Sequence, residues 1–346
     1  MRVLIELLLF LLLCYCISGA NNRYNTKCFN GCTCDANSIE CVNTKVTDFS
    51  FLSRIDKNNF PHLQYLTIVG AQMGDLNDSN LFGNRIHYNL ERINFTNCGI
   101  TYFGERTFSG APNLSYLYMN GNPIHRIPPK ALSQMQSLKT VSFSRIFDAD
   151  RLHNEPNLRN LLDSSLPQLQ NVYLTGNSLR FDVGELFCKF SNLMLIDLSN
   201  NRLSNFTLNC ATKIDRLRLR TNELISIPRL EGKVERLDVT DNPLDCEFDL
   251  CQNESNFDYV VNKNLTFCAA PVRFKGTPLE SLFNNRDCGS HYFRYIFIVI
   301  FIFFVFLIVK FKVWELLCCH DRKQKSSSNR YDLIQMSDEV IEPTYL

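Results

Sequence analysis

Three arginines stand on alternate positions of the segment 213–224, and a period of two is typical of a strand. Arg216, Arg218 and Arg220 are separated by Leu217 and Leu219, so in a strand the guanidinium groups point to one face and the leucines to the other. Guanidinium groups bind carboxylates or phosphates. The formal net charge of the chain is only +1, whereas nucleic-acid binding requires a large local excess of cations. We therefore predict no nucleic-acid partner.

The histidines form no catalytic or metal-binding pattern. Six of them are scattered along the chain, at His62, His87, His125, His153, His291 and His320. The sequence has no H-E-x-x-H or G-x-S-x-G motif and no phosphate-binding loop. We therefore predict that the protein is not an enzyme and has no cofactor or bound metal.

Ten cysteines have a spacing that favours disulfide chemistry. Four cluster early (Cys28, Cys32, Cys34, Cys41), four late (Cys246, Cys251, Cys268, Cys288), and Cys188 and Cys210 lie between. The C-x-C spacing alone would also suit zinc, but even-numbered clusters in an exported segment indicate disulfides. Cys188 and Cys210 lie at matching places of successive repeats, and either form a bridge or remain two separate thiols.

Two apolar segments indicate that the region between them is exported. Residues 1–20 have the features of a secretory signal peptide, with an apolar run and then Ser18-Gly19-Ala20. A second run extends from Tyr292 to Val309; as a helix it would be about 27 Å long, close to the bilayer core. A buried core helix is the alternative, but the run has no polar face. We expect a transmembrane helix over 291–313, with the N-terminus extracellular at the plasma membrane.

Glycosylation sequons occur only in this predicted extracellular segment. The six candidate acceptors are Asn77, Asn94, Asn113, Asn205, Asn253 and Asn264. None lies in the tail at 314–346. This distribution is typical of a secreted or cell-surface glycoprotein.

A repeated pattern, L-x-x-L-x-L-x-x-N-x-L, accounts for most of the exported segment. It starts eight times, at intervals of 20 to 31 residues, at Leu63, Leu90, Leu114, Leu138, Leu169, Leu193, Ile214 and Val234. One repeat of this length cannot bury its own apolar face, so the repeats must stack. The ninth-position Asn122, Asn177, Asn201, Asn222 and Asn242 are expected to satisfy backbone groups of adjacent turns. Cys98 occupies the same place in an early repeat, and we expect a buried free thiol there.

The pattern resembles that of extracellular leucine-rich repeat proteins, over about residues 28–288. The resemblance implies a solenoid with a curved parallel sheet on its concave face and a mostly irregular or 3₁₀ convex side. The expected organisation is an N-terminal cysteine-rich cap (21–62), eight repeats (63–242) and a C-terminal cysteine-rich cap (243–290). The segments "CFNGCTCDANSIEC" and "NPLDCEFDLC" resemble the two caps. That likeness implies the pairs Cys28–Cys34, Cys32–Cys41, Cys246–Cys268 and Cys251–Cys288. The C-x4-C spacing of the last cap departs from the usual C-x-C.

The third, fifth and seventh positions of the eight repeats point out of the sheet, and we call this surface the concave face. Arg218 falls between Asp197 and Asp238 in the fifth-position column and is expected to pair with both. Tyrosine and arginine carry much of the energy of protein interfaces, and an ordinary solvated sheet is the alternative. The candidate ligand-binding residues are Tyr65, Tyr116, Tyr118 and Tyr173 toward one end, and Arg216, Arg220 and Arg236 at the other. A glycan on Asn94 would cover part of the tyrosine end.

One repeat carries an insertion, Arg151 to Pro167. We expect it to form a loop with a short helix after Pro156. It is either a second contact surface or a tolerated addition.

The tail contains three short motifs. Cys318 and Cys319 are candidates for palmitoylation at the membrane lipid. Tyr331 to Ile334 resembles a tyrosine-based sorting signal, and the end, Thr344 to Leu346, resembles a ligand of PDZ scaffold proteins.

The expected function is that of a single-pass adhesion molecule or co-receptor that binds an extracellular protein ligand or a membrane co-receptor. The alternative is an auxiliary subunit of a membrane ion channel that acts through its transmembrane segment.

Overall fold

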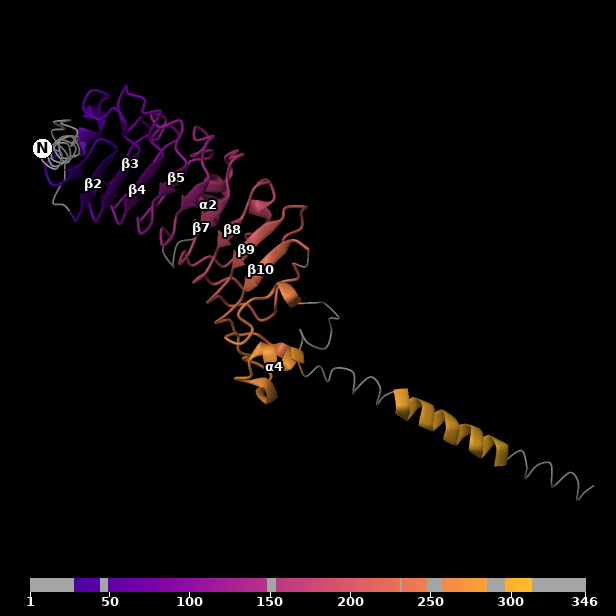
Figure 1. Ribbon diagram of the computed structural model, residues 1–346. Coiled ribbons are helices and arrows are strands. Elements are labelled where there is room, and N and C mark those ends of the chain that lie inside the picture. Colours follow the sequence, from indigo (N-terminus) through magenta and orange to yellow (C-terminus); the bar gives the residue numbers. More distant parts are fainter. Residues whose placement is uncertain are drawn as a thin grey trace, which may run out of the picture. The chain divides into compact units, whose positions relative to one another are not determined.

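Short strands recur along the computed structural model and lie side by side in a single stack (Figure 1). The structure describes residues 28–43, 49–147, 154–230, 232–247, 257–284 and 296–312. It divides into two units, Met1–Asn284 and Asn285–Leu346. The strands all belong to the first unit.

The described strands form one sheet whose spatial order is the chain order. All neighbours from β2 to β10 are parallel, and β1 pairs antiparallel with β2. The bounds are β1 Thr33–Cys34, β2 Ser38–Val42, β3 Tyr65–Val69, β4 Arg92–Thr96, β5 Tyr116–Tyr118, β6 Thr140–Ser142, β7 Asn171–Tyr173, β8 Leu195–Asp197, β9 Ile214–Arg218 and β10 Val234–Asp238. This arrangement confirms the predicted parallel solenoid.

The repeats stack in register, which places equivalent positions opposite one another. Leu66 of β3 pairs with Ile93 of β4, which pairs with Leu117 of β5, and all three side chains are buried. The leucine, isoleucine and valine positions of every repeat thereby join one continuous apolar core. The residues between them along each strand face away from that core.

A ladder of buried asparagines connects each repeat to the one before it. The Nδ2 of Asn122 donates to the carbonyl of Phe95 in the preceding repeat (2.7 Å) and to that of Met119 in its own (2.7 Å). Its Oδ1 accepts from the backbone N–H groups of Cys98 (2.9 Å) and Ile100 (3.1 Å). The same use of both amide atoms is seen at Asn177, Asn201, Asn222 and Asn242. The predicted role of these asparagines is confirmed.

The side opposite the sheet consists mainly of turns and short 3₁₀ segments. The 3₁₀ segments of this part are η1, Ser50–Arg54, and η2, Gly184–Phe187. Close packing limits side-chain size here, because a Cβ on Gly184 would lie 1.7 Å from the backbone oxygen of Thr207. The convex side therefore has the predicted character, except where the insertion adds an α-helix.

That helix, α2 (Asn154–Leu162), begins before Pro156 rather than after it. A proline in the first turn of a helix is tolerated because its missing N–H would have no intrahelical acceptor. Leu158, Leu161 and Leu162 enter the apolar core. The expected position of the helix was thus wrong by a few residues.

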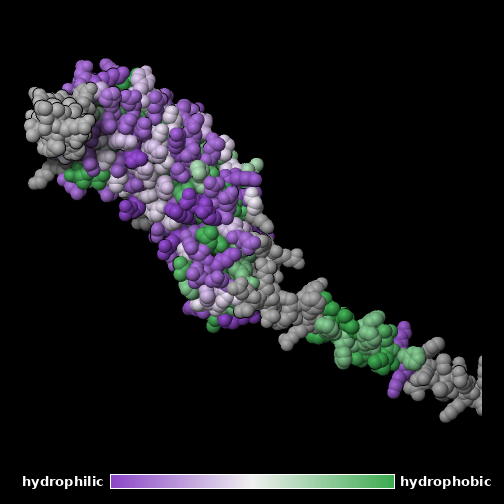
Figure 2. Space-filling model, viewed as in Figure 1, coloured by the Kyte–Doolittle hydropathy of each residue, from purple (hydrophilic) through white to green (hydrophobic). Residues whose placement is uncertain are grey.

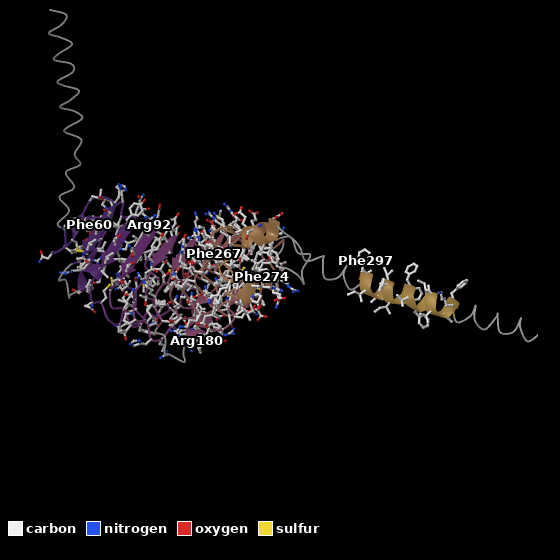
Figure 3. All side chains as sticks on the ribbon, turned by 90° about the horizontal axis from the view of Figure 1, so that it is seen from below. Phe60, Arg92, Arg180, Phe267, Phe274 and Phe297 are labelled. Atoms are coloured by element: carbon white, nitrogen blue, oxygen red, sulfur yellow. A yellow bond between two sulfur atoms is a disulfide. The ribbon has the colours of Figure 1, made fainter. Side chains whose placement is uncertain are left out.

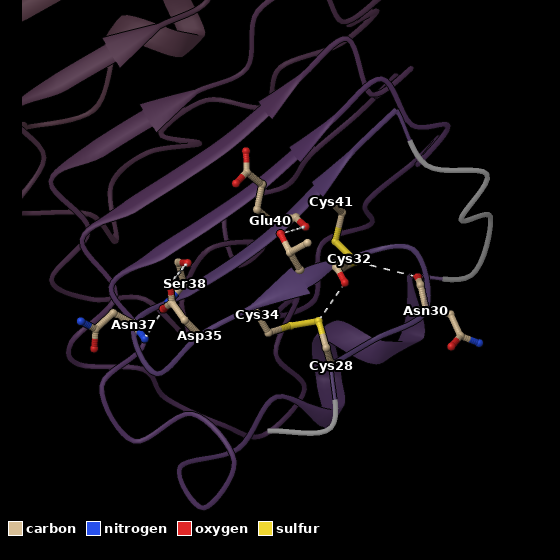
Figure 4. The surroundings of a disulfide bond; sticks show 10 residues. Cys28, Asn30, Cys32, Cys34, Asp35, Asn37, Ser38, Glu40 and Cys41 are labelled. Atoms are coloured by element: carbon tan, nitrogen blue, oxygen red, sulfur yellow. Dashed lines mark hydrogen bonds between the residues drawn. A yellow bond between two sulfur atoms is a disulfide. The ribbon is translucent and has the colours of Figure 1, made fainter. Parts of the chain in front are cut away.

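Two disulfides hold the N-terminal cap against the first strands (Figure 4). Cys28 is bonded to Cys34 and Cys32 to Cys41, which are the pairs that the resemblance implied. The ring of Phe29 packs on Phe51, with 4.4 Å between the ring centroids. β1 is the outermost strand of the sheet at this end.

The C-terminal cap covers the other end of the sheet. It contains η3 (Phe257–Tyr259), η4 (Val272–Phe274) and α4 (Leu279–Asn284). The backbone N–H of Val261 donates to the carbonyl of Leu237 on β10 (2.9 Å), and Cys246 is bonded to Cys268. The pair Cys251–Cys288 lies outside the described residues.

Three further cysteines lie in the described repeats. Cys188 and Cys210 form a disulfide, with 5.7 Å between their Cα atoms, so the bridge rather than two separate thiols is found. Cys98 is a buried free cysteine. Its Sγ–H donates to the carbonyl of Ile68 at 3.1 Å.

In the second unit, residues 296–312 form a helix. Its phenylalanine, isoleucine, leucine and valine side chains are exposed, and Figure 2 shows this segment as hydrophobic, in contrast to the largely hydrophilic surface of the repeats on the face drawn. Among the residues that the structure describes, none of the helices has the length and apolar character needed to cross a membrane.

Candidate functional site

The tyrosine end of the concave face is organised around Arg92. Tyr65, Arg92 and Tyr116 occupy the third position on β3, β4 and β5, and the strand register places them opposite one another. The guanidinium carbon of Arg92 lies over both rings, 5.5 Å from the centroid of Tyr65 and 5.0 Å from that of Tyr116. Both distances are within the range of favourable cation–π interactions. Each of the two tyrosines therefore supports the arginine between them.

Tyr118 and Tyr173 extend the aromatic surface along the fifth-position column. Ser142 separates them, since Tyr118 pairs with Ser142 and Ser142 with Tyr173. Burial raises the pKa of the Tyr118 phenol above its usual value; Arg92 opposes this effect, and Tyr173 and Tyr116 add to it. At neutral pH the Tyr118 hydroxyl is consequently protonated and able to donate a hydrogen bond.

Arg218 pairs with one carboxylate rather than two. Its Nη1 lies 3.2 Å from the Oδ2 of Asp197. Asp238 instead accepts from the Thr240 hydroxyl (2.8 Å) and from the Asn262 amide (3.1 Å). The expected double pairing was wrong on the Asp238 side, because local hydrogen bonds to the C-terminal part of the stack already satisfy that carboxylate.

The other arginines at this end differ in how accessible their charge is. The Nε of Arg220 donates to Asp241 at 2.8 Å, and this carboxylate raises the pKa of the guanidinium. Arg216 and Arg236 lie opposite each other on β9 and β10 and are exposed. Neither has an ion-pair partner among the described residues. Arg220 is thus internally neutralised, whereas Arg216 and Arg236 are not.

Arg92 was not among the predicted binding residues, because arginines were expected only at the other end of the concave face. The third-position column nevertheless contained the signal, because Arg92 falls between Tyr65 and Tyr116 once the repeats are aligned. Figure 3 labels Arg92 among the strands, and Arg180 on the opposite edge of the first unit. The structure brings together Tyr65, Tyr116 and Tyr118 around Arg92. It places Arg216 and Arg236 five and six strands further along.

The described sequons differ in their position relative to this face. Asn77, Asn113, Asn205 and Asn264 are exposed and lie outside the concave face. Asn94 lies on β4, two residues from Arg92. Its Oδ1 accepts a hydrogen bond of 2.6 Å from the Thr96 hydroxyl. Asn253 is outside the described residues.

The described part of the insertion packs against the preceding repeat and does not project as a loop. Asn157 of α2 accepts from the N–H of Ile127 (3.0 Å) and donates to the carbonyl of His125 (3.0 Å). Asn160 donates to the carbonyl of Ile127 (2.8 Å), and the Ser164 hydroxyl accepts from Leu132 (3.1 Å). On the convex side, polar side chains of the insertion thus bond to backbone groups of the preceding repeat, as the asparagine ladder does elsewhere. Residues 151–153 lie outside the described part.

Across the described residues, no group of three or more His, Cys, Asp or Glu is placed to hold a metal ion. The candidate site is therefore an open surface of aromatic rings, hydroxyl groups and one stacked cation. The predicted signal peptide at 1–20 and the predicted tail motifs lie outside the described residues. The tail residues concerned are Cys318, Cys319, Tyr331, Ile334, Thr344 and Leu346.

Comparison with known proteins supports the same architecture. The family described as Leucine Rich Repeat matches residues 113–135. The Leucine-rich repeat-containing G-protein coupled receptor 5 of Xenopus tropicalis is 24% identical over 140 residues, which is 40% of this chain and 15% of the receptor. The chain thus matches only a small part of that relative.

Among solved structures, human 5T4, also called Wnt-activated inhibitory factor 1 or trophoblast glycoprotein, is similar with a TM-score of 0.61. It is 21% identical in sequence, and the alignment covers 74% of this chain and 97% of 5T4. At this identity the likeness shows the fold. The parallel sheet of stacked repeats in this chain is consistent with that likeness.

Proposed function

We propose that this leucine-rich repeat protein is a cell-surface adhesion molecule or co-receptor that binds a protein ligand through its concave face. Proteins of this fold are typically interaction scaffolds, since stacked repeats present an extended surface without an enclosed reaction site. The receptor and glycoprotein relatives support a cell-surface role of this general kind. The observation that carries the proposal is the aromatic surface around Arg92.

The composition of that surface is suited to protein recognition. Tyrosine contributes large contact area with few rotatable bonds and a hydroxyl that directs hydrogen bonds. Tyr116 and Tyr118 alternate with the buried Leu117 on β5, so both rings are held by a strand that is paired on each side. A partner would therefore meet rings that are already ordered, which lowers the entropic cost of binding.

The proposed topology is that of a single-pass protein with its repeats outside the cell. Disulfides in both caps support an oxidising compartment. In this proposal 1–20 is a signal peptide, the run from Tyr292 to Val309 crosses the bilayer, and 314–346 is cytoplasmic. The tail motifs would then connect the protein to lipid, sorting proteins or a PDZ scaffold.

Proximity labelling on the surface of living cells tests the proposal. The full chain, fused to a labelling enzyme, is compared with a variant carrying Tyr116→Ala and Tyr118→Ala. Loss of specific labelled neighbours from the variant supports the concave face as the binding surface. Tyr88→Ala is the matched control, because Tyr88 is exposed but lies outside the concave face.

The channel-subunit alternative predicts the opposite result. Replacing the run from Tyr292 to Val309 with an unrelated apolar helix would then abolish the specific neighbours, and the tyrosine substitutions would leave them unchanged. Equal surface levels of all variants, measured with an antibody to a tag inserted after Ala20, are required for the comparison.

A further inference from the structure

Arg92 differs from Arg218 and Arg220 because no carboxylate of the described residues neutralises its charge. Arg218 is bonded to Asp197, and Arg220 to Asp241. Arg92 is exposed, and no described carboxylate lies within ion-pair distance of it. Its contacts are with the faces of two aromatic rings.

The guanidinium of Arg92 is held over two rings, and no hydrogen bond from it is found among the described residues. The N–H donors of arginine lie in the plane of the group as a fixed fork. The rings of Tyr65 and Tyr116 therefore restrict the long side chain and leave its planar fork of donors available. A carboxylate accepts such a fork through both oxygens, which is the strong bidentate geometry.

The strands β3, β4 and β5 contain no acidic residue that could compete for Arg92. The fifth-position residues beside Arg92 are Thr67, Asn94 and Tyr118 on β3, β4 and β5, and all three are neutral hydrogen-bonding side chains at neutral pH. Glu40, on the same column, is on β2, two strands from β4 and so about 10 Å away at the usual strand spacing. A carboxylate brought by a partner would meet one cation and several hydrogen-bond donors.

We propose that the Tyr65–Arg92–Tyr116 stack is a recognition point for a carboxylate side chain of the protein ligand, carried on an acidic segment that lies across the tyrosine end of the concave face. This inference rests on the proposed function and specifies its partner chemistry. A phosphate group is the less favoured ligand, because a dianion would require a second cation and the described residues of β3, β4 and β5 contain none besides Arg92.

The sequon at Asn94 places a condition on this site. A glycan on Asn94 would start from the same strand and would compete with the ligand for the surface. The proposal therefore requires that the native chain bind its ligand with the Asn94 sequon intact.

Binding of the full chain to peptides with a fixed central residue tests the inference. The chain, purified in detergent micelles, is applied to arrays of random nonapeptides whose central position is Glu, Gln, phosphoserine or Lys. We expect selective binding of the Glu array, weakened about tenfold or more by Arg92→Gln, since a hydrogen bond to a charged group is worth roughly 1.5–3 kcal/mol. Arg92→Lys should restore only part of it, because lysine has no planar fork.

Arg180→Gln is the matched control, since Arg180 is an exposed arginine away from the concave face. The unfolding temperatures of all variants must agree, so that loss of binding is not loss of fold. Thr96→Val removes the sequon but keeps the Asn94 side chain, and it should leave binding unchanged. Binding that appears only in Thr96→Val would overturn the proposal.

The remaining outcomes separate this inference from the proposed function. Peptide binding that ignores the central residue but is lost in Tyr116→Ala would overturn the carboxylate assignment and leave the concave face as the binding surface. Preference for phosphoserine over Glu would likewise reject the carboxylate. Binding that neither Arg92→Gln nor Tyr116→Ala affects would contradict both proposals.

Discussion

At the scale of single residues, buried polar atoms determine how the repeats are held together. Each ninth-position asparagine bonds to backbone N–H and carbonyl groups that leave the sheet and so have no neighbouring strand to pair with. The buried thiol of Cys98 stands at that position in its own repeat and is within weak hydrogen-bond distance of the Ile68 and Thr96 carbonyls. Substitution of a ninth-position asparagine therefore removes several buried hydrogen bonds, whereas substitution of Cys98 removes at most a weak one.

Asn122→Ala is expected to lower the free energy of unfolding by about 3 kcal/mol. The substitution leaves buried N–H and carbonyl groups without partners, and each such group costs roughly 1–3 kcal/mol. Denaturant titration followed by circular dichroism measures the loss. Asn58→Ala, at an exposed position, is the control and should change little; equal effects of the two substitutions would contradict the role of the ladder.

Cys98 is expected to resist alkylation in the folded chain. Burial raises the pKa of its thiol to about 11, so almost no thiolate is present at pH 8. Iodoacetamide followed by peptide mass spectrometry should find Cys98 unmodified in native protein and fully modified in urea. Rapid modification of the native chain would show that this repeat opens readily.

At the scale of structural elements, the link between Cys188 and Cys210 joins two successive turns of the convex side. Each of these cysteines is partly buried against the core. The bond closes a loop with a sequence separation of 22, and a loop of this size implies a stabilisation of about 3 kcal/mol.

The double variant Cys188→Ala and Cys210→Ala should therefore unfold at lower denaturant concentration, by about that free energy. Peptide mapping without reductant should find the two cysteine peptides linked in the native chain. An unchanged unfolding midpoint together with unlinked peptides would contradict the bridge.

The elements also show which features could be predicted from the sequence. Register was predictable because the asparagine and leucine positions recur together, and a one-residue slip would expose every core side chain of a strand. The contact of Arg92 with Tyr65 and Tyr116 was not, since it depends on side-chain rotamers across three strands. The start of α2 was misjudged because Pro156 can occupy the first turn as readily as it can precede a helix.

At the scale of the whole molecule, the buried histidine His87 in the first repeats couples the free energy of unfolding to pH. His87 is buried, and its Nε2 has no partner among the described residues. The Phe82 ring lies against it, with 4.7 Å between the ring centroids. Burial lowers the pKa of His87, and Arg85 and Lys57 lower it further, while Asp56 and the Ile55 backbone oppose them.

Acidification is therefore expected to destabilise the fold through His87. The unfolded chain takes up a proton near the ordinary histidine pKa of 6.5, whereas the folded chain does so only at lower pH. The contribution of His87 is thus fully present above pH 6.5 and is lost as the pH falls below it.

Unfolding temperatures measured between pH 7.5 and 5 should show a decline that His87→Leu makes smaller. His62→Gln, at an exposed histidine, should leave the decline unchanged. An identical pH dependence for the native chain and His87→Leu would exclude His87 as its source.

The reversed direction of β1 has a consequence for assembly. A parallel sheet of stacked repeats could in principle be extended at its ends by another copy, but at one end the short strand β1 runs antiparallel and is fastened by two disulfides. At the far end, the chain after β10 already bonds to Leu237. A two-residue edge strand at one end and a backbone bond at the other therefore leave little sheet edge in the described residues on which a second copy could pair.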